Sequence, residues 1–141
     1  MSARGHIIII EDDHDDKDML VEIIEEITAK HKIIWFDTCD KAYNYLCHTQ
    51  DPIFIIFSDI NLPKKNGLEL KEEIDKNPEL KIKSIPFVFY STSASDKDVT
   101  AAYKHLNIQG FFEKENDYNA IKCNIKTIID YWSISKRPQY Y

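Results

Sequence analysis

The sequence predicts an α/β fold in which a doubly wound, five-stranded parallel sheet carries helices on both faces. Five short apolar runs of strand length alternate along the chain with stretches whose apolar residues recur at helical spacing. One of these runs, residues 53–58, is apolar until its last residue, which is typical of a strand buried on both faces. Strict alternation of strands and helices favours a parallel sheet joined by right-handed crossovers.

The first half of the chain contains three of the strands and two of the helices. Residues 7–10 are consecutive isoleucines, a β-branched run of strand length. Residues 32–36 form the second predicted strand, and the run described above is the third. A helix over about residues 39–48 lies between them, with Asp37 expected as its N-cap and Asp40 as the acid three residues later. The first helix is predicted where apolar residues share one face and glutamates the other: Leu20, Ile23, Ile24 and Ile27 against Glu22, Glu25 and Glu26.

The second half completes the alternation. Its predicted elements are, in order, a helix marked by Leu68, Leu70 and Ile74, a strand at 86–90, a helix after the capping-box pattern Ser95–Asp98, a strand at 109–113 and a helix marked by Ile121, Ile125, Ile128 and Trp132. The first of these helices is expected to end before Pro78, because the residue before a proline disfavours helical geometry. Residues 77–85 are therefore expected to form a loop.

Length and composition indicate one compact domain, which we place at residues 6–134. A chain of 141 residues, 43% of them hydrophobic, can bury a true core, which argues against a disordered protein. Residues 1–5 are expected to form an N-terminal extension and residues 135–141 a C-terminal tail.

Charge and cysteine content argue against several classes of protein. The formal charge is −6 and no basic cluster is present, which argues against nucleic-acid binding. The three cysteines lack CxxC spacing, so a disulfide framework or zinc site is not expected, and a reducing cytoplasm fits best. The run of four isoleucines is too short for a signal peptide or a membrane span. The sequence therefore predicts a cytoplasmic protein without a membrane partner.

Polar side chains follow four of the five predicted strands. They are Glu11 and Asp12, then Asp59, Ser91 and finally Lys114. In an open α/β sheet, ligands bind beyond the carboxyl ends of the strands, so these groups can converge on one cleft. Carboxylates in contact repel one another, so at least one should have a raised pKa unless a cation such as Mg²⁺ is bound.

The same set suits the transfer of a phosphoryl group. Lys114 supplies a positive charge and Ser91 a hydroxyl donor for phosphoryl oxygens, and Asp59 would be the nucleophile that forms an aspartyl phosphate. Thr92 is the alternative hydroxyl if the register of the fourth strand differs by one residue. We interpret residues 13–16, which are mostly acidic, as a solvated helix cap rather than a second metal site.

Together these residues resemble the receiver domain of two-component response regulators, the CheY-like family. The similarity covers residues 6–134 and rests on Glu11-Asp12, the segment from Asp59 to Pro63 with Gly67, Ser91 and Lys114. The family has a flavodoxin-like (βα)5 fold with strand order 2-1-3-4-5, and the resemblance implies the same order here. The long 77–85 loop and the final helix with Trp132 further resemble stand-alone, single-domain receivers that act beside sensor kinases.

The resemblance implies a role for each acidic residue. Asp59 would be the phosphoacceptor, and Asp12 and Asp59 would bind Mg²⁺ directly. The backbone carbonyl of Asn61 would be a further ligand, and Glu11 would act through a metal-bound water.

The resemblance also implies a switch and reveals two departures from the family pattern. Ser91 and Lys114 would bind the phosphoryl group, and Phe111 would be the aromatic that turns inward as Ser91 moves. The less favoured alternative is that Phe111 is only a core aromatic. Glu115 stands where the family usually has proline, and a cis bond before it would cost about 3 kcal/mol. Phe111 stands where tyrosine is common, so a switch there would act through packing alone.

The expected function is that of a response regulator rather than a turnover enzyme. A sensor histidine kinase or a phosphotransfer protein would donate a phosphoryl group to Asp59 with Mg²⁺ as cofactor. The face formed by helix 4, strand 5 and helix 5 would then bind a downstream protein or a second copy of the chain. One alternative is a degenerate receiver that binds partners without phosphorylation, which Glu115 leaves open. The other is a phosphatase with an aspartate nucleophile, which is less favoured because Asn61 replaces the second general acid.

Overall fold

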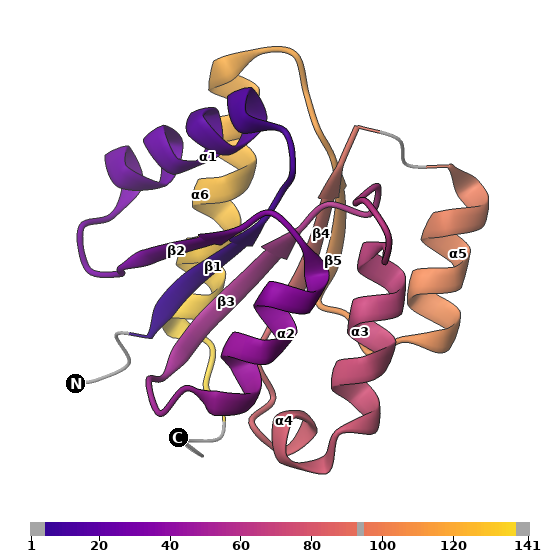
Figure 1. The fold of residues 1–141 in the computed structure, drawn as a ribbon. Coiled ribbons are helices and arrows are strands. Elements are labelled where there is room, and N and C mark those ends of the chain that lie inside the picture. Colours follow the sequence, from indigo (N-terminus) through magenta and orange to yellow (C-terminus); the bar gives the residue numbers. More distant parts are fainter. Residues whose placement is uncertain (1–4, 93–94, 138–141) are drawn as a thin grey trace.

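The computed structural model describes residues 5–92 and 95–137, apart from the side chain of His105, and it confirms the predicted α/β fold. Residues 1–4 of the predicted extension and 138–141 of the predicted tail lie outside the described residues. The five strands form one parallel sheet in the order β2-β1-β3-β4-β5 (Figure 1), which confirms the expected order. They are β1 His6–Ile10, β2 Ile33–Phe36, β3 Ile53–Ser58, β4 Phe87–Ser91 and β5 Gly110–Glu113.

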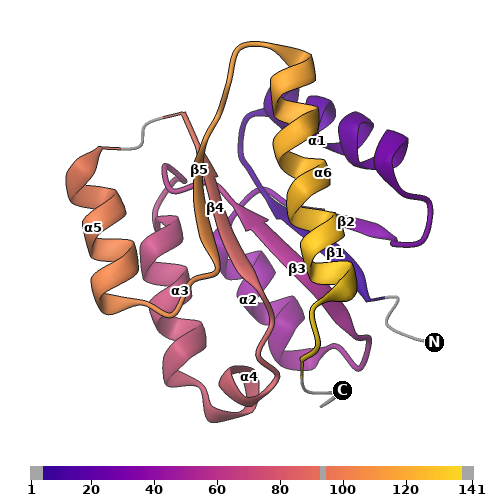
Figure 2. The same cartoon turned by 180° about the vertical axis from the view of Figure 1, so that it is seen from behind.

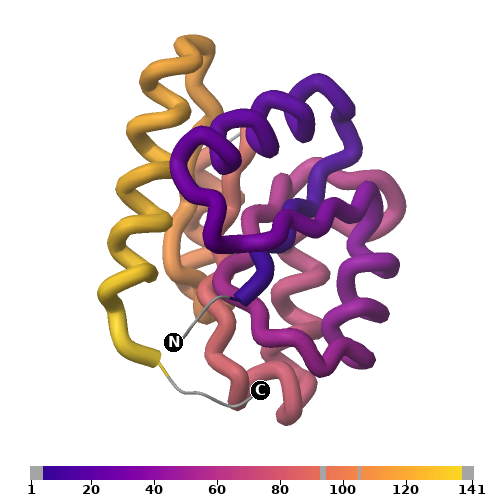
Figure 3. Tube along the Cα trace, turned by 90° about the vertical axis from the view of Figure 1, so that its left-hand side faces the viewer, coloured from indigo at the N-terminus to yellow at the C-terminus, as the bar shows by residue number. Residues whose placement is uncertain are grey.

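Helices cover both faces of the sheet. They are α1 His14–Ile27, α2 Cys39–His48, α3 Gly67–Lys76, α4 Pro78–Ile82, α5 Asp96–His105 and α6 Tyr118–Ile134. Helices α1 and α6 lie side by side on one face, while α2, α3 and α5 cover the other (Figures 1 and 2). The view along the sheet shows α6 and α2 on opposite sides of it (Figure 3). None of the helices in the described ranges is both long and apolar enough to cross a membrane.

The isoleucine run of β1 explains why both faces need a helical cover. Ile8 and Ile10 pack toward α2 and α3, whereas Ile7 and Ile9 pack toward α1 and α6. Each of the four is at most 1% exposed, and burying a side chain of this size contributes roughly 2 kcal/mol. A strand of this composition is stable only at the centre of a two-sided sheet.

The pairing of β1 with β3 sets which residues meet at the edge of the sheet. The register shifts between His6 and Ile7, so Phe54 is the extra residue of a bulge in β3. Beyond the bulge the pairing is regular, and Ile10 lies opposite Ser58. The next residues of the two strands, both acidic, therefore leave the sheet side by side.

The segment expected to be a loop contains the short helix α4, so that prediction was wrong. Pro78 does end α3, but it also starts α4, because a proline at the first helical position loses no needed N–H bond. The side chain of Asn77 caps the new helix by accepting hydrogen bonds from the N–H groups of Glu79 and Leu80. Leu80, 3% exposed, then packs into the core.

Two predicted helix caps have different outcomes. The N-cap of α2 is Thr38 and not Asp37: the Thr38 hydroxyl accepts a hydrogen bond from the Lys41 N–H at 3.3 Å. The Asp37 carboxylate instead pairs with the Lys41 ammonium at 2.9 Å. For α5 the N-cap of the predicted capping box is confirmed, because the Ser95 hydroxyl accepts from the Asp98 N–H at 3.1 Å.

The end of the described chain is tied to β3. The guanidinium of Arg137 donates hydrogen bonds to the carbonyl oxygens of Ile53 and Phe54, both at 2.5 Å. It also lies over the ring of Phe54, 5.6 Å from its centroid. Arg137 thus satisfies the backbone at the bulge.

Candidate functional site

The carboxyl ends of β1, β3, β4 and β5 meet at one edge of the sheet. The Asp59 N–H donates to the carbonyl of Ile10 at 3.0 Å, which fixes Asp59 beside Glu11. On the other side, the Lys114 N–H donates to the carbonyl of Ser91 at 2.9 Å. The backbone ladder therefore delivers two carboxylates, a hydroxyl and an ammonium group to the same edge.

Asp59 is a buried carboxylate with an asymmetric environment. It is 7% exposed, and its Oδ1 accepts hydrogen bonds from the N–H groups of Ile60 at 2.7 Å and Asn61 at 3.3 Å. Its Oδ2 instead faces the Lys114 ammonium at 3.5 Å. The two oxygens are thus distinguished before any ligand binds.

Gly67, the first residue of α3, packs directly against the backbone of Asp59. A Cβ at this position would overlap the Asp59 carbonyl oxygen and would lie 3.0 Å from the ring of Phe89. The Gly67 N–H also donates to the carbonyl of Ile60 at 2.9 Å. Because Gly67 has no side chain, α3 can begin in direct contact with the backbone of Asp59.

Glu11, Asp12 and Asp59 form an acidic group that fits a divalent cation. One carboxylate oxygen from each lies within 4.8 Å of the others. Glu11 and Asp59 are buried and Asp12 is exposed. Oxygens at such separations can share a hard cation that takes ligands at about 2.1 Å and keeps several waters. The side chain of Asn61 is exposed, and its backbone belongs to the same loop.

Lys114 lies between several carboxylates. Its Nζ is 2.5 Å from Glu11 Oε1, 3.1 Å from Asp16 Oδ2 and 3.5 Å from Asp59 Oδ2. Its side chain is only 9% exposed, and the peptide bond to Glu115 is trans. The ammonium group therefore reaches the acidic group with Glu115, rather than proline, as the next residue.

Burial and charge shift the titration of this cluster. Burial raises the pKa of Glu11 to about 7, and the charge of Asp59 adds to this, although Lys114 and the N–H of Asp13 oppose it. Burial would lower the pKa of Lys114, but its contacts with Glu11, Asp59 and Asp16 outweigh burial and raise it. Glu11 can therefore exchange a proton for a cation near neutral pH.

Ser91 and Phe111 occupy defined places on the neighbouring strands. Ser91 is the last residue of β4 and is fully buried, whereas Thr92 is exposed and lines a cavity together with Glu11 and Lys114. Phe111 on β5 is half-buried and packs on the ring of Phe89, with a centroid distance of 5.7 Å. Phe111 faces the side of the sheet covered by α2, α3 and α5.

Asp16 and Trp35 contact the site, although sequence analysis predicts no role for either of them there. The sequence predicts that Asp16 belongs to a solvated helix cap, yet its carboxylate pairs with Lys114. The cap itself is Asp13, whose Oδ1 accepts from the Asp16 N–H at 3.0 Å. Trp35 donates from Nε1 to the carbonyl of Glu11 at 2.7 Å. Both contacts join residues far apart in the chain, and no local sequence pattern marks them.

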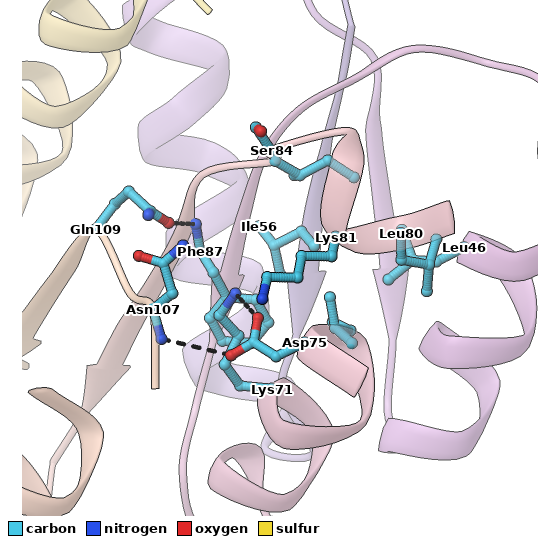
Figure 4. Close-up of a pocket in the computed structure, with 12 residues that line it drawn as sticks. Leu46, Ile56, Lys71, Asp75, Leu80, Lys81, Ser84, Phe87, Asn107 and Gln109 are labelled. Carbon is cyan, nitrogen blue, oxygen red and sulfur yellow. Dashed lines mark hydrogen bonds and ion pairs between the residues drawn. The ribbon is translucent and has the colours of Figure 1, made fainter. Parts of the chain in front are cut away.

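A separate cavity of about 60 Å³ lies at the amino ends of β4 and β5, opposite the acidic group (Figure 4). Lys71 and Asp75 from α3 form an ion pair there at 2.7 Å. Asp75 also accepts from the Asn107 N–H at 3.4 Å, and Gln109 Oε1 accepts from the Phe87 N–H at 2.7 Å. The first of these hydrogen bonds joins α3 to the segment before β5, and the second joins that segment to β4. Both lie at the opposite edge of the sheet from Glu11, Asp12 and Asp59.

Comparisons with known proteins agree on one family. The family model for the response regulator receiver domain matches residues 7–126. Response regulator Rcp1 of Synechocystis sp. is 30% identical over 132 residues, which span 89% of this chain and 87% of that protein. The crystal structure of the phosphorylated cyanobacterial phytochrome response regulator RcpA is similar with a TM-score of 0.84 and 27% identity, covering 97% of this chain and all of that one. The Mn²⁺-bound form of Rcp1 is similar with a TM-score of 0.82 and 28% identity, covering 96% and 99%.

Proposed function

The chain belongs to the response regulator receiver domain family of two-component signalling, and from this premise we propose that Asp59 accepts a phosphoryl group from a sensor histidine kinase or a phosphotransfer protein. One observation carries the proposal: Asp59, Glu11, Asp12 and Lys114 lie together at the carboxyl edge of the sheet. A nucleophile, a cation site and a fixed positive charge are the groups that phosphoryl transfer requires.

Asp59 acts as the nucleophile through the oxygen that faces Lys114. Oδ1 is held by two backbone N–H groups, so we assign the new bond to Oδ2. The Oδ2–phosphorus bond forms as the phosphorus–nitrogen bond of the donor phosphohistidine breaks, and the electron pair of that bond returns to the imidazole. Lys114 and the Ser91 hydroxyl bind the phosphoryl oxygens in their new position.

A divalent cation, most simply Mg²⁺, belongs to this proposal. Asp12, Asp59 and the backbone carbonyl of Asn61 would hold it directly, and Glu11 would hold it through a water. When bound, it supplies positive charge that offsets the charge of the carboxylates and the phosphoryl group. The neutral-range pKa of Glu11 supports this assignment, because a buried carboxylate gains from a bound counter-ion.

Phosphorylation then switches partner binding on one face of the domain. This face is formed by α5, β5 and α6. The short helix α4 lies between α3 and β4, so the helices that follow β4 and β5 are α5 and α6. Phe111 lies beneath this face and would reorient with Ser91 when the phosphoryl group binds. Tyr103 on α5 and Tyr131 on α6 are each 57% exposed and are available to a downstream protein or a second copy. The free cysteines among the described residues fit a cytoplasmic location.

The test is incubation with acetyl phosphate and Mg²⁺ followed by intact mass measurement. A gain of about 80 Da, one phosphoryl group, is expected in the wild-type protein and is lost in Asp59→Asn and in EDTA. Asp15→Asn is the matched control. Asp15 is exposed on α1, so this substitution removes the same charge at a position outside the acidic group.

Each other outcome identifies a different function. Absence of an adduct from acetyl phosphate and from a cognate kinase would identify a phosphorylation-independent interaction module. Release of phosphate from a phosphoester over many turnovers would identify a phosphatase with Asp59 as nucleophile.

A further inference from the structure

Asp16 is a more exposed partner of Lys114 than the buried carboxylates of the acidic group. Its Oδ2 lies 3.1 Å from Lys114 Nζ, closer than Asp59 Oδ2 at 3.5 Å. The Asp16 side chain is 40% exposed, compared with 8% for Asp59. The ammonium is therefore shared between buried carboxylates of the acidic group and one carboxylate outside it.

The position of Asp16 is fixed by the start of α1. Its N–H donates to Oδ1 of the N-cap Asp13, and it lies in the first turn of the helix. Asp16 is not part of the group formed by Glu11, Asp12 and Asp59 that fits a cation. It can therefore keep its contact with Lys114 when that group binds a metal.

A cavity beside the ion pair leaves room for the lysine to move. It has a volume of about 190 Å³, and Glu11, Asp16, Tyr90 and Lys114 are among its lining residues. The Lys114 ammonium lies over the ring of Tyr90, 5.9 Å from its centroid. A swing of the side chain between Glu11 and Asp16 thus stays within a space bordered by both carboxylates.

We propose that Asp16 is a positioning residue that holds Lys114 at the edge of the site once the buried carboxylates bind a divalent cation. Without metal, Lys114 neutralises Glu11 and Asp59. With metal, Glu11 and Asp59 no longer need the ammonium and the cation repels it, so Asp16 is the carboxylate left to pair with it. The inference rests on the proposed cation site but not on phosphorylation.

Asp16→Asn should therefore weaken Mg²⁺ binding, because Lys114 then competes more strongly for Glu11 and Asp59. Mg²⁺ affinity can be measured through the fluorescence of Trp35, which donates a hydrogen bond to the Glu11 carbonyl. To leave Trp35 as the only tryptophan, the parent protein and all of its variants carry the substitution Trp132→Phe. We expect the Kd for Mg²⁺ to rise about fivefold in Asp16→Asn.

Three controls separate positioning from loss of charge. Asp15→Asn removes the same charge from the same helical turn and should change the Kd by less than about twofold. Asp16→Glu keeps the charge and should restore an affinity close to that of the parent protein. In a Lys114→Met background, Asp16→Asn should have no larger effect than Asp15→Asn, because the residue being positioned is gone.

Three results would overturn the inference: equal effects of Asp16→Asn and Asp15→Asn with Lys114 present, an undiminished effect of Asp16→Asn without Lys114, or no Mg²⁺ binding by the parent protein. Failure of the proposed phosphorylation would register separately, as the absence of the mass adduct in the wild-type protein.

Discussion

Removing the charge of Asp75 should destabilise the protein far more than removing the charge of its partner. Lys71 and Asp75 pair at 2.7 Å beside the cavity at the amino ends of β4 and β5. The Lys71 side chain is 6% exposed and its ammonium lies 5.5 Å from the centroid of Phe87, so it has little access to water. The Asp75 side chain is 20% exposed and also accepts from the Asn107 N–H.

The magnitude follows from which charge is left without a partner. In Asp75→Asn the buried ammonium of Lys71 loses its counter-charge, which typically costs 3–5 kcal/mol of unfolding free energy. We expect about 3 kcal/mol, because the new amide oxygen can still accept one hydrogen bond. In Lys71→Met the aliphatic volume is kept and Asp75 can take up water, so the expected loss is about 1 kcal/mol. The double variant should lie within about 1 kcal/mol of the wild type.

Urea unfolding measures these differences, and thermal unfolding gives an independent check. A loss of about 3 kcal/mol corresponds to a decrease in Tm of roughly 10 °C for a chain of this size. The control is Glu72→Gln, which breaks the exposed Lys76–Glu72 pair on the same helix, whose side chains are 75% and 58% exposed. It should change the unfolding free energy by less than about 0.5 kcal/mol. The reasoning fails if Asp75→Asn and Glu72→Gln have the same effect, or if Lys71→Met costs more than Asp75→Asn.

Three further predictions concern the site and the end of the chain. Gly67→Ala should lower the unfolding free energy by about 2 kcal/mol and reduce phosphorylation of Asp59, because the added methyl group overlaps the Asp59 carbonyl; unchanged urea unfolding would contradict this. In EDTA, the unfolding free energy should fall as pH rises from about 4.5 to about 7, because the raised pKa of Glu11 makes the folded state bind the proton more tightly than the unfolded state. Urea titrations at several pH values measure this slope, and Glu11→Gln should flatten it. Arg137→Ala should cost about 2 kcal/mol in thermal unfolding, because it removes two hydrogen bonds from a charged donor to the bulge at Phe54, and a negligible change would show that the bulge is satisfied by solvent.

Local signals account for the parts of the fold that were predicted correctly. A run such as residues 53–58 can be stable only as a buried strand, and the alternation with amphipathic segments leaves few arrangements of a parallel sheet. Where several local signals compete, the sequence is ambiguous. Pro78 can end one helix and also start another, and Asp37 and Thr38 are adjacent residues that both suit an N-cap.

The sequence by itself determined the strands, their acidic and polar ends, and the pattern around Asp59 that resembles the receiver family. These features are encoded within a few residues of one another, because a strand end and the loop after it are local. Only the tertiary structure decided that Lys114 contacts Asp16, 98 residues away, and that Glu11 is buried enough to raise its pKa. Contacts of this kind depend on how α1 packs beside α6 and on where the parallel strands end. Burial is a property of the surroundings of a residue in space rather than of its neighbours in the chain.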